Sequence, residues 1–134
     1  MRQKGFATLE VILMVTVIGI LAAIAVPRFT AVTTAANTAK IQADLTTIDT
    51  AISIYYMEHG SYPTGLSDLS DYLRGVDSST DTLKPPSGQC YLGGETKSVP
   101  STSYTIDTVD SESRAICGSG NTAEKFYLPK KTSD

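Results

Sequence analysis

The sequence predicts an α+β fold in which one long N-terminal helix packs on a small antiparallel sheet. Two observations predict it. Residues 11–27 carry no charge, and apolar residues then recur every three or four positions as far as residue 55. Short segments with the pattern of strands come only after residue 89. Because the chain has 134 residues, it has room for a single domain, which excludes a multidomain enzyme.

The first half of the predicted helix, residues 6–27, has the length and composition of a membrane span. As a helix it extends about 33 Å, close to the roughly 30 Å hydrocarbon core of a bilayer. Arg2 and Lys4 precede it and the next cation is Arg28, which favours a cytoplasmic N-terminus and an exported remainder. The alternative is a secretory signal cleaved near Ala25, but the run is long for a signal and continues without a polar break.

The second half of the helix is amphipathic and is expected to end near Glu58. Its apolar positions share a spacing of three or four residues: Phe29, Val32, Ala36, Ala39, Ile41, Leu45, Ile48, Ile52 and Tyr55. Gly60 is a candidate left-handed stop, and Pro63 follows it. His59 lies in the last turn, where a cation suits the helix dipole, and this explanation is preferred to a catalytic role.

Beyond the helix the sequence predicts a short helix, a loop and several strands. Leu66, Leu69 and Leu73 have the spacing of a short helix that packs on the long one. The polar, turn-rich residues 75–88 predict a surface loop. Strands are predicted at 90–92, 103–109, 114–117 and 125–128, with a turn at 110–112, so three or four antiparallel strands should cross the outer half of the long helix.

Cys90 and Cys117 are expected to form a disulfide, because the membrane segment would export both to an oxidising compartment. The loop-entropy model assigns about 3 to 4 kcal/mol to such a bridge. Two free thiols are the alternative. A metal site is not expected, since zinc usually takes four ligands and the chain offers two cysteines and a single, distant histidine.

The remaining polar residues do not indicate an enzyme, and no cofactor is expected. The sequence has no Gly-rich phosphate loop and no H-E-x-x-H pattern. From residue 28 onward 9 Lys+Arg stand against 13 Asp+Glu, which argues against a general nucleic-acid binder. The cluster Lys125, Lys130 and Lys131 is interpreted as solvated, with DNA binding as the weaker alternative. The cluster Asp107, Asp110 and Glu112 is also interpreted as solvated, with Ca²⁺ binding as the weaker alternative.

Glu10 is a carboxylate inside the apolar run, where a charge is costly and usually has a partner or a task. One interpretation is that Glu10 lies one turn inside the boundary and reaches the headgroups. The other requires a cation at the same depth. A cut between Gly5 and Phe6 would supply it as the new α-amino group of Phe6, in the same chain or in a neighbouring copy.

The segment KGFATLE, the apolar run and Pro27 together resemble the N-terminal signature of type IV pilins and of the related pseudopilins of type II secretion. That pattern is a basic leader ending in Gly, an aromatic first mature residue, Glu at the fifth mature position, and Pro closing the apolar run. The matching residues are Arg2, Lys4, Gly5, Phe6, Glu10 and Pro27. The order ATLE replaces the commoner TLIE, and the softer match at Tyr55–Leu73 lies where pilin helices give way to a loop.

The resemblance implies the type IV pilin fold, with a leader at 1–5, a transmembrane and assembly helix at 6–27, and a globular domain at 28–134. It implies that a prepilin peptidase cuts after Gly5 and methylates the amine of Phe6. Glu10 would then pair with that amine in an adjacent subunit and set the axial register of a filament.

Two helix-weakening residues, Gly19 and Pro27, bracket a stretch that in pili of this type can lose helix on assembly, and a simple kink at Pro27 is the alternative. The partners implied are identical subunits through the N-terminal helices, the peptidase, and an inner-membrane assembly platform with its ATPase. The chain would reside in the bacterial inner membrane with a cytoplasmic N-terminus, then in an extracellular or periplasmic filament.

Three hypotheses for function follow. The first is a structural type IV pilin for adhesion, motility or DNA uptake. The second is a pseudopilin that forms a short periplasmic filament for type II secretion or competence. The third is a signal-anchored binding ectodomain that never polymerises. The cysteine pair favours the first hypothesis over a secretion pseudopilin, and the segment at the end of the helix favours either of the first two over the third.

Overall fold

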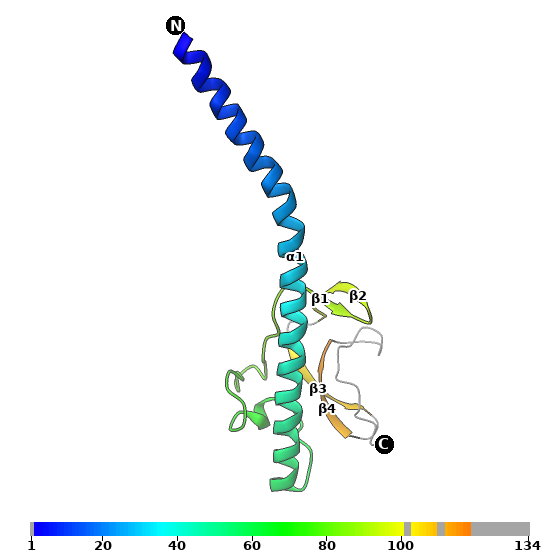
Figure 1. The fold of residues 1–134 in the computed structure, drawn as a ribbon. Coiled ribbons are helices and arrows are strands. Elements are labelled where there is room, and N and C mark those ends of the chain that lie inside the picture. The colour runs from blue at the N-terminus through cyan, green and yellow to red at the C-terminus, as the bar shows by residue number, and fades with distance from the viewer. Residues whose placement is uncertain (1, 101–102, 110–111, 119–134) are drawn as a thin grey trace. The chain divides into compact units, whose positions relative to one another are not determined.

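The computed structural model describes residues 2–100, 103–109 and 112–118 (Figure 1). The elements in chain order are α1 (Arg2–His59), the 3-10 turn η1 (Ser67–Leu69), β1 (Gln89–Leu92), β2 (Glu95–Ser98), β3 (Tyr104–Val109) and β4 (Glu112–Cys117). This arrangement of one long helix with small antiparallel sheets confirms the predicted α+β class. The chain divides into two compact units, residues 1–33 and residues 34–134.

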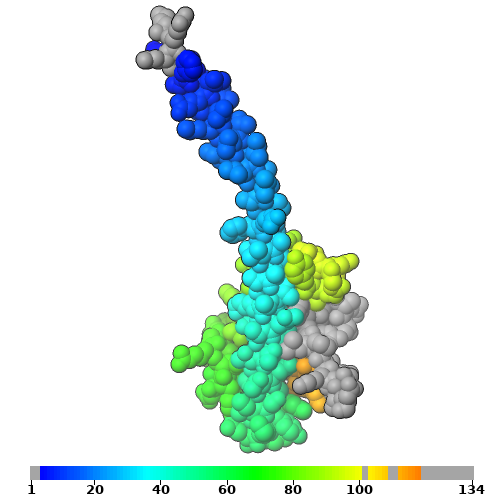
Figure 2. All heavy atoms as spheres, in the orientation of Figure 1, coloured from blue at the N-terminus to red at the C-terminus, as the bar shows by residue number. Residues whose placement is uncertain are grey.

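The first unit is a stretch of α1 whose apolar side chains are not buried. Every large apolar residue from Phe6 to Val32 is 48% to 75% exposed (Figure 2). Thr8 and Thr16 satisfy their hydroxyl groups within the helix by donating to the carbonyls of Lys4 and Ile12, at 3.0 Å and 2.7 Å. By length and composition α1 can cross a membrane. A helix that is apolar on all sides requires lipid or protein around it.

In the second unit, one face of α1 supplies the core. The predicted positions Ile41, Leu45, Ile48 and Ile52 are all buried, because their spacing of four, three and four residues keeps them on one face. The same cluster contains Ala51 of α1. It also contains residues from the loop and from the strands: Leu66, Leu69, Leu73, Cys90, Tyr104, Ala115 and Cys117.

The helix ends as its sequence predicts. Gly60 has φ of +71°, a left-handed conformation that favours glycine, and its N–H donates to the carbonyl of Tyr56 at 2.8 Å. The predicted short helix is a single 3-10 turn, and its Leu69 packs in the core with Leu66 and Leu73. Residues 75–88 form an irregular loop, as predicted, with one isolated bridge between Asp77 and Thr82.

The described strands form two separate antiparallel pairs, β1 with β2 and β3 with β4, where the sequence suggested one sheet. Strand β2 is not among the predicted strands, because all four of its residues are exposed and none is apolar. The turn Gly93–Gly94, with φ of +62° and +85°, forms this strand by folding it back on β1. The strand predicted at 125–128 lies outside the described residues.

Candidate functional site

The candidate site lies in the first unit and begins at the Gly5–Phe6 bond. A side chain at Gly5 would meet no atom within 4 Å, and the φ angle of Gly5 is not in the left-handed region. Among the described residues, neither packing nor backbone conformation therefore requires glycine at this position. Phe6 follows with its ring 74% exposed. Cleavage at this bond stays a prediction.

Glu10 lies one helical turn beyond Phe6, and its side chain is exposed. It is the only acidic residue before Asp44 in the sequence. Among the described residues no hydrogen bond or ion pair involves the Glu10 carboxylate. A carboxylate on an apolar helix is costly in hydrocarbon, and the pairing expected for Glu10 stays a prediction.

Gly19 and Pro27 lie inside α1, which continues through both. Pro27 has no N–H, so the carbonyl of Ala23 loses the donor that an ordinary residue would provide four positions later. A side chain at Gly19 would meet no atom within 4 Å, so packing within the described chain does not require this glycine either. The loosening of the helix between Gly19 and Pro27 stays a prediction, because α1 is continuous through both residues.

Polar side chains of α1 hold the strands in the second unit. The amide of Asn37 donates to the carbonyls of Ser87 and Gln89 at 3.2 Å and 3.0 Å, and the Thr38 hydroxyl accepts from the N–H of Tyr91 at 2.8 Å. These contacts occupy the edge of β1 that faces away from β2. Sequence patterns centred on apolar residues did not single out Asn37 or Thr38.

Two carboxylates of α1 bind the second strand pair. Asp44 accepts from the buried phenol of Tyr104 at 2.7 Å, and desolvation, with this hydrogen bond, raises the pKa of Tyr104. Asp49 accepts from the N–H of Ala115 at 2.7 Å and from the Arg114 guanidinium at 3.1 Å. These contacts position β3 and β4 on the helix. No sequence motif predicts these contacts, because the strand residues lie more than 50 positions from Asp44 and Asp49 in the chain.

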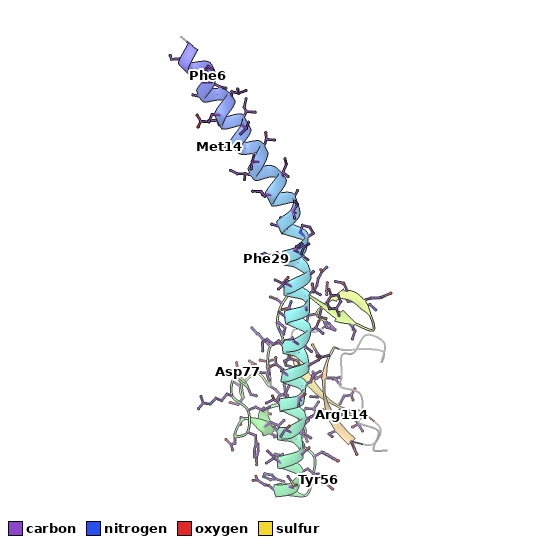
Figure 3. The ribbon with its side chains drawn as sticks, in the orientation of Figure 1. Phe6, Met14, Phe29, Tyr56, Asp77 and Arg114 are labelled. Carbon is purple, nitrogen blue, oxygen red and sulfur yellow. The ribbon has the colours of Figure 1, made fainter. Side chains whose placement is uncertain are left out.

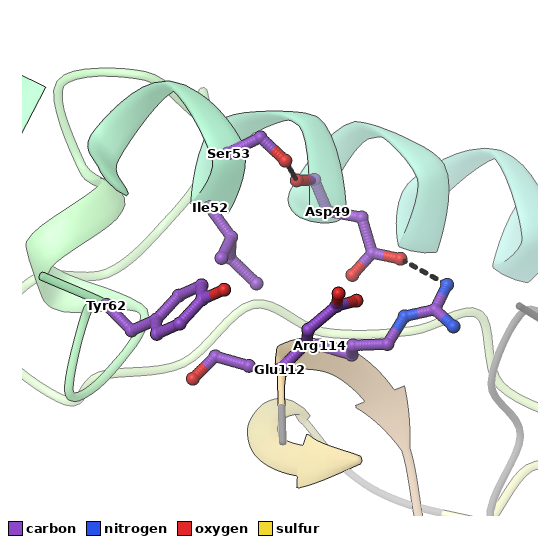
Figure 4. A pocket seen from close by; sticks show the side chains of 7 residues that line it. Asp49, Ile52, Ser53, Tyr62, Glu112 and Arg114 are labelled. Carbon is purple, nitrogen blue, oxygen red and sulfur yellow. Dashed lines mark hydrogen bonds and ion pairs between the residues drawn. The ribbon is translucent and has the colours of Figure 1, made fainter. Parts of the chain in front are cut away.

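Asp49 and Arg114 also form part of a surface pocket of about 380 Å³ (Figure 4). The Tyr62 ring lies at one side, Ile52 extends from α1, and Glu112 extends from β4 beside Arg114. The described residues contain no group of three potential metal ligands. Of the three acidic residues weighed as a Ca²⁺ site, Asp110 lies outside the described part of the chain.

Cys90 on β1 and Cys117 on β4 are both fully buried and belong to the same core cluster. The structure holds no bond between their sulfur atoms. Burial raises the pKa of the Cys90 thiol by desolvating its charged form. The disulfide therefore stays a prediction, and any bridge would lie in the apolar interior.

Comparisons with known proteins bear on this combination of an exposed apolar helix and a small α+β unit. No family model and no solved structure matches the chain. It is 32% identical over 87 residues to "Type II secretion system core protein G" of Klebsiella pneumoniae, covering 65% of this chain and 62% of that protein. It is 41% identical over 64 residues to "Type IV narrow pilus major component PilA5" of Thermus thermophilus, covering 48% and 55%.

A third relative is "Fimbrial protein" of Neisseria meningitidis, 33% identical over 79 residues, which cover 59% of this chain and 44% of that protein. The match thus spans less than two thirds of each of these three relatives. Fold and site define a class of proteins that join an apolar N-terminal helix to a small α+β domain. These relatives are homologues of the chain, and they are proteins of the type IV pilin and pseudopilin family, whose members are structural and not enzymes.

Proposed function

We propose that this protein is a structural subunit of a type IV pilus and assembles through its N-terminal helix. The observation that carries the proposal is the exposed apolar surface of the first unit, which is interrupted by a single carboxylate. Burying a large apolar side chain contributes about 1.5–3 kcal/mol, so packing such helices together supplies a strong driving force once the subunits leave the lipid. Monomeric soluble proteins rarely expose a contiguous apolar surface of this extent.

Assembly begins with removal of the leader, residues 1–5, by a prepilin peptidase. The open surroundings of Gly5 and the exposed ring of Phe6 support access by such an enzyme. Cleavage and methylation leave a cationic secondary amine on Phe6. Residues 6–27 hold the processed subunit in the inner membrane, with the N-terminus on the cytoplasmic side and the remainder outside.

Glu10 sets the register between neighbouring subunits. Its carboxylate pairs with the amine of Phe6 in the adjacent copy, which removes two unpaired charges from an apolar bundle. Support comes from the position of Glu10 one turn beyond Phe6 and from the lack of a partner for it among the described residues. Gly19 and Pro27 let the intervening helix loosen as the subunit enters the filament. The assembly platform and its ATPase supply the motion.

A second candidate function is that of a pseudopilin in a short periplasmic filament for type II secretion or competence. The relative from Klebsiella pneumoniae favours it by name. The PilA5 and fimbrial relatives and the cysteine pair favour the pilus. Both functions require assembly through the N-terminal helices. They differ in the location of the filament and in its role, which for the pilus is adhesion, motility or DNA uptake.

Replacing Glu10 tests the proposal. Glu10→Gln removes the charge and keeps the size, and Met14→Leu is a matched control on the same exposed helix. Membrane-bound monomer, cleavage at Phe6 and sheared filaments are measured together in the producing cell. We expect normal monomer and cleavage with few filaments for Glu10→Gln, and normal values of all three for Met14→Leu. Normal filaments in Glu10→Gln would eliminate the ionic register.

Deleting the gene separates the two candidate functions. Loss of surface filaments with intact secretion of exported enzymes supports the pilus. Loss of secretion with unchanged surface filaments supports the pseudopilin. If purified, processed protein stays monomeric outside the membrane and neither phenotype appears, the protein is the third candidate, a binding ectodomain that does not polymerise.

A further inference from the structure

Two tyrosine rings lie stacked on the surface of the second unit, where α1 ends. Tyr56 lies in the last turn of the helix (Figure 3), and Tyr62 lies in the loop that follows. Their ring centroids are 4.5 Å apart and their planes differ by 27°, which is a stacked arrangement. Both rings are accessible, since Tyr56 is 44% exposed and Tyr62 is 39% exposed. We refer to these two residues as the tyrosine pair.

The backbone at the end of the helix brings the tyrosine pair together. Gly60 has φ of +71°, and its N–H donates to the carbonyl of Tyr56 at 2.8 Å, so the chain leaves the helix immediately beyond this turn. Pro63 is buried, and a proline restricts the backbone of the residue before it, which here is Tyr62. Local backbone structure therefore favours the stacked arrangement of the two rings.

The other described tyrosines lack this combination of exposure and facing rings. Tyr55 and Tyr72 meet edge to face, with ring centroids 6.2 Å apart and ring planes at 81°. Tyr91 is 41% exposed, but within the described part of the chain it makes no ring contact. Tyr104 is buried. An oxidant in solution thus meets two phenols that already face each other only at the tyrosine pair, among the residues that the structure describes.

We propose that the tyrosine pair is a modification site, at which hydrogen peroxide and a haem peroxidase join the two rings as an intrachain dityrosine. Each phenol loses one electron and its hydroxyl proton, which gives two phenoxyl radicals. A carbon–carbon bond forms between the ring carbons next to the two oxygen-bearing carbons. Each newly bonded carbon then loses its proton, and each oxygen regains one. The two electrons and two protons released overall reduce one peroxide molecule to two water molecules.

Stacking favours this product because it places both reactants in one site. Radicals that form on separate chains must first meet, whereas radicals on the tyrosine pair react within the molecule. The product is a covalent bridge that ties the last turn of α1 to the loop beyond Gly60. Like a disulfide, it restricts the unfolded chain and opposes opening of the helix end. The inference goes beyond the proposed filament function and does not depend on it, because both rings belong to one chain.

Peptide mapping of the oxidised protein tests the proposal. The purified full-length chain in detergent is treated with hydrogen peroxide and a haem peroxidase, then cleaved after lysine, arginine and glutamate. This cleavage yields peptides 41–58 and 59–74, which separate Tyr56 from Tyr62. We expect the two peptides to remain joined, with a mass lower than their sum by two hydrogen atoms. Fragment spectra should place the bond between Tyr56 and Tyr62.

A conservative variant removes the reaction and keeps the stack. Tyr62→Phe retains the ring but lacks the hydroxyl that must be oxidised, so it should lower the yield of joined peptides at least about tenfold. Tyr91→Phe is the matched control, because Tyr91 has a similar exposure, and it should leave the yield unchanged. Equal yields in the two variants would overturn the proposal.

Met57 reports whether the oxidant reaches the end of the helix. Its side chain is 75% exposed and gains one oxygen atom as the sulfoxide. The peroxide concentration is raised until Met57 is converted, so sulfoxide without joined peptides would show that the rings do not couple and would refute the proposal. A mixture of ¹⁴N and ¹⁵N copies should give joined peptides of one isotope only. Mixed-isotope products would place the bond between copies and would also refute it.

Discussion

The Asp49 carboxylate on α1 accepts a hydrogen bond from the backbone N–H of Ala115 on β4 at 2.7 Å. Its second oxygen binds the guanidinium of Arg114 at 3.1 Å, and both side chains of that pair are largely shielded from solvent. One helix side chain thus fixes a strand by its backbone and by its neighbouring residue. Because Ala115 is buried, its N–H has no water to replace this partner.

We predict that Asp49→Ala lowers the free energy of unfolding of the second unit by about 2–3 kcal/mol, since it leaves a buried N–H and a partly buried guanidinium unpaired. Asp49→Asn keeps an acceptor for Ala115 and should cost about half as much. Lys40→Ala is the control, because its ion pair with Asp44 is exposed and should contribute under about 1 kcal/mol. Denaturant unfolding of the full chain in detergent measures all three. Equal values for Asp49→Ala and Lys40→Ala would contradict this role.

A second prediction concerns pH. The Thr64 backbone N–H and hydroxyl both donate to Asp68 at 2.8 Å, and these bonds hold the pKa of that carboxyl below its ordinary value of 3.8. Because the folded pKa is lowered, the stabilisation is complete above about pH 3.8 and is lost as the pH falls through the folded value. Asp68→Ala should therefore be less stable than the natural protein at pH 7, and the difference should shrink as the pH falls below the ordinary value of 3.8. A difference that stays constant with pH would exclude the charged form as its source.

The cysteines give a third prediction. If Cys90 and Cys117 pair after export, an alkylating reagent added to the denatured, unreduced protein will modify neither. Denaturation is essential, because both thiols are buried in the folded chain and would escape the reagent even if unpaired. The protein treated with reductant is the control and should gain two labels. Two labels without reductant would mean that the bridge does not form.

The sequence predicted the elements that follow from simple periodicity. One face of the helix carries the buried residues Ile41, Leu45, Ile48 and Ile52, and Gly60 ends the helix. The buried face and the helix end depend on nearby residues alone, so the sequence predicts both. Phe29 and Val32 continue the same spacing but are 75% and 67% exposed, because they lie in the first unit, where no core covers them. Periodicity identifies a face and does not identify what covers it.

Other features depend on contacts that no local pattern reveals. The strand β2 owes its place to the turn Gly93–Gly94, since its residues Glu95–Ser98 are all exposed. Gly65 lies close to a residue far along the chain, because a Cβ there would meet the Asp81 carboxylate at 2.7 Å and Asp81 would have to move. That same carboxylate accepts from the N–H of Ser67. Such long-range pairs appear only once the chain is folded.

The mass of the mature N-terminus tests the central claim most directly. If the protein is a filament subunit of this family, removal of residues 1–5 creates the cation that Glu10 requires. Mass spectrometry of the N-terminal peptide from exported protein should then find a chain that begins at Phe6 and carries one added methyl group. An N-terminus near Ala25 would show that the apolar helix is discarded as a secretory signal, and it would contradict assembly through that helix.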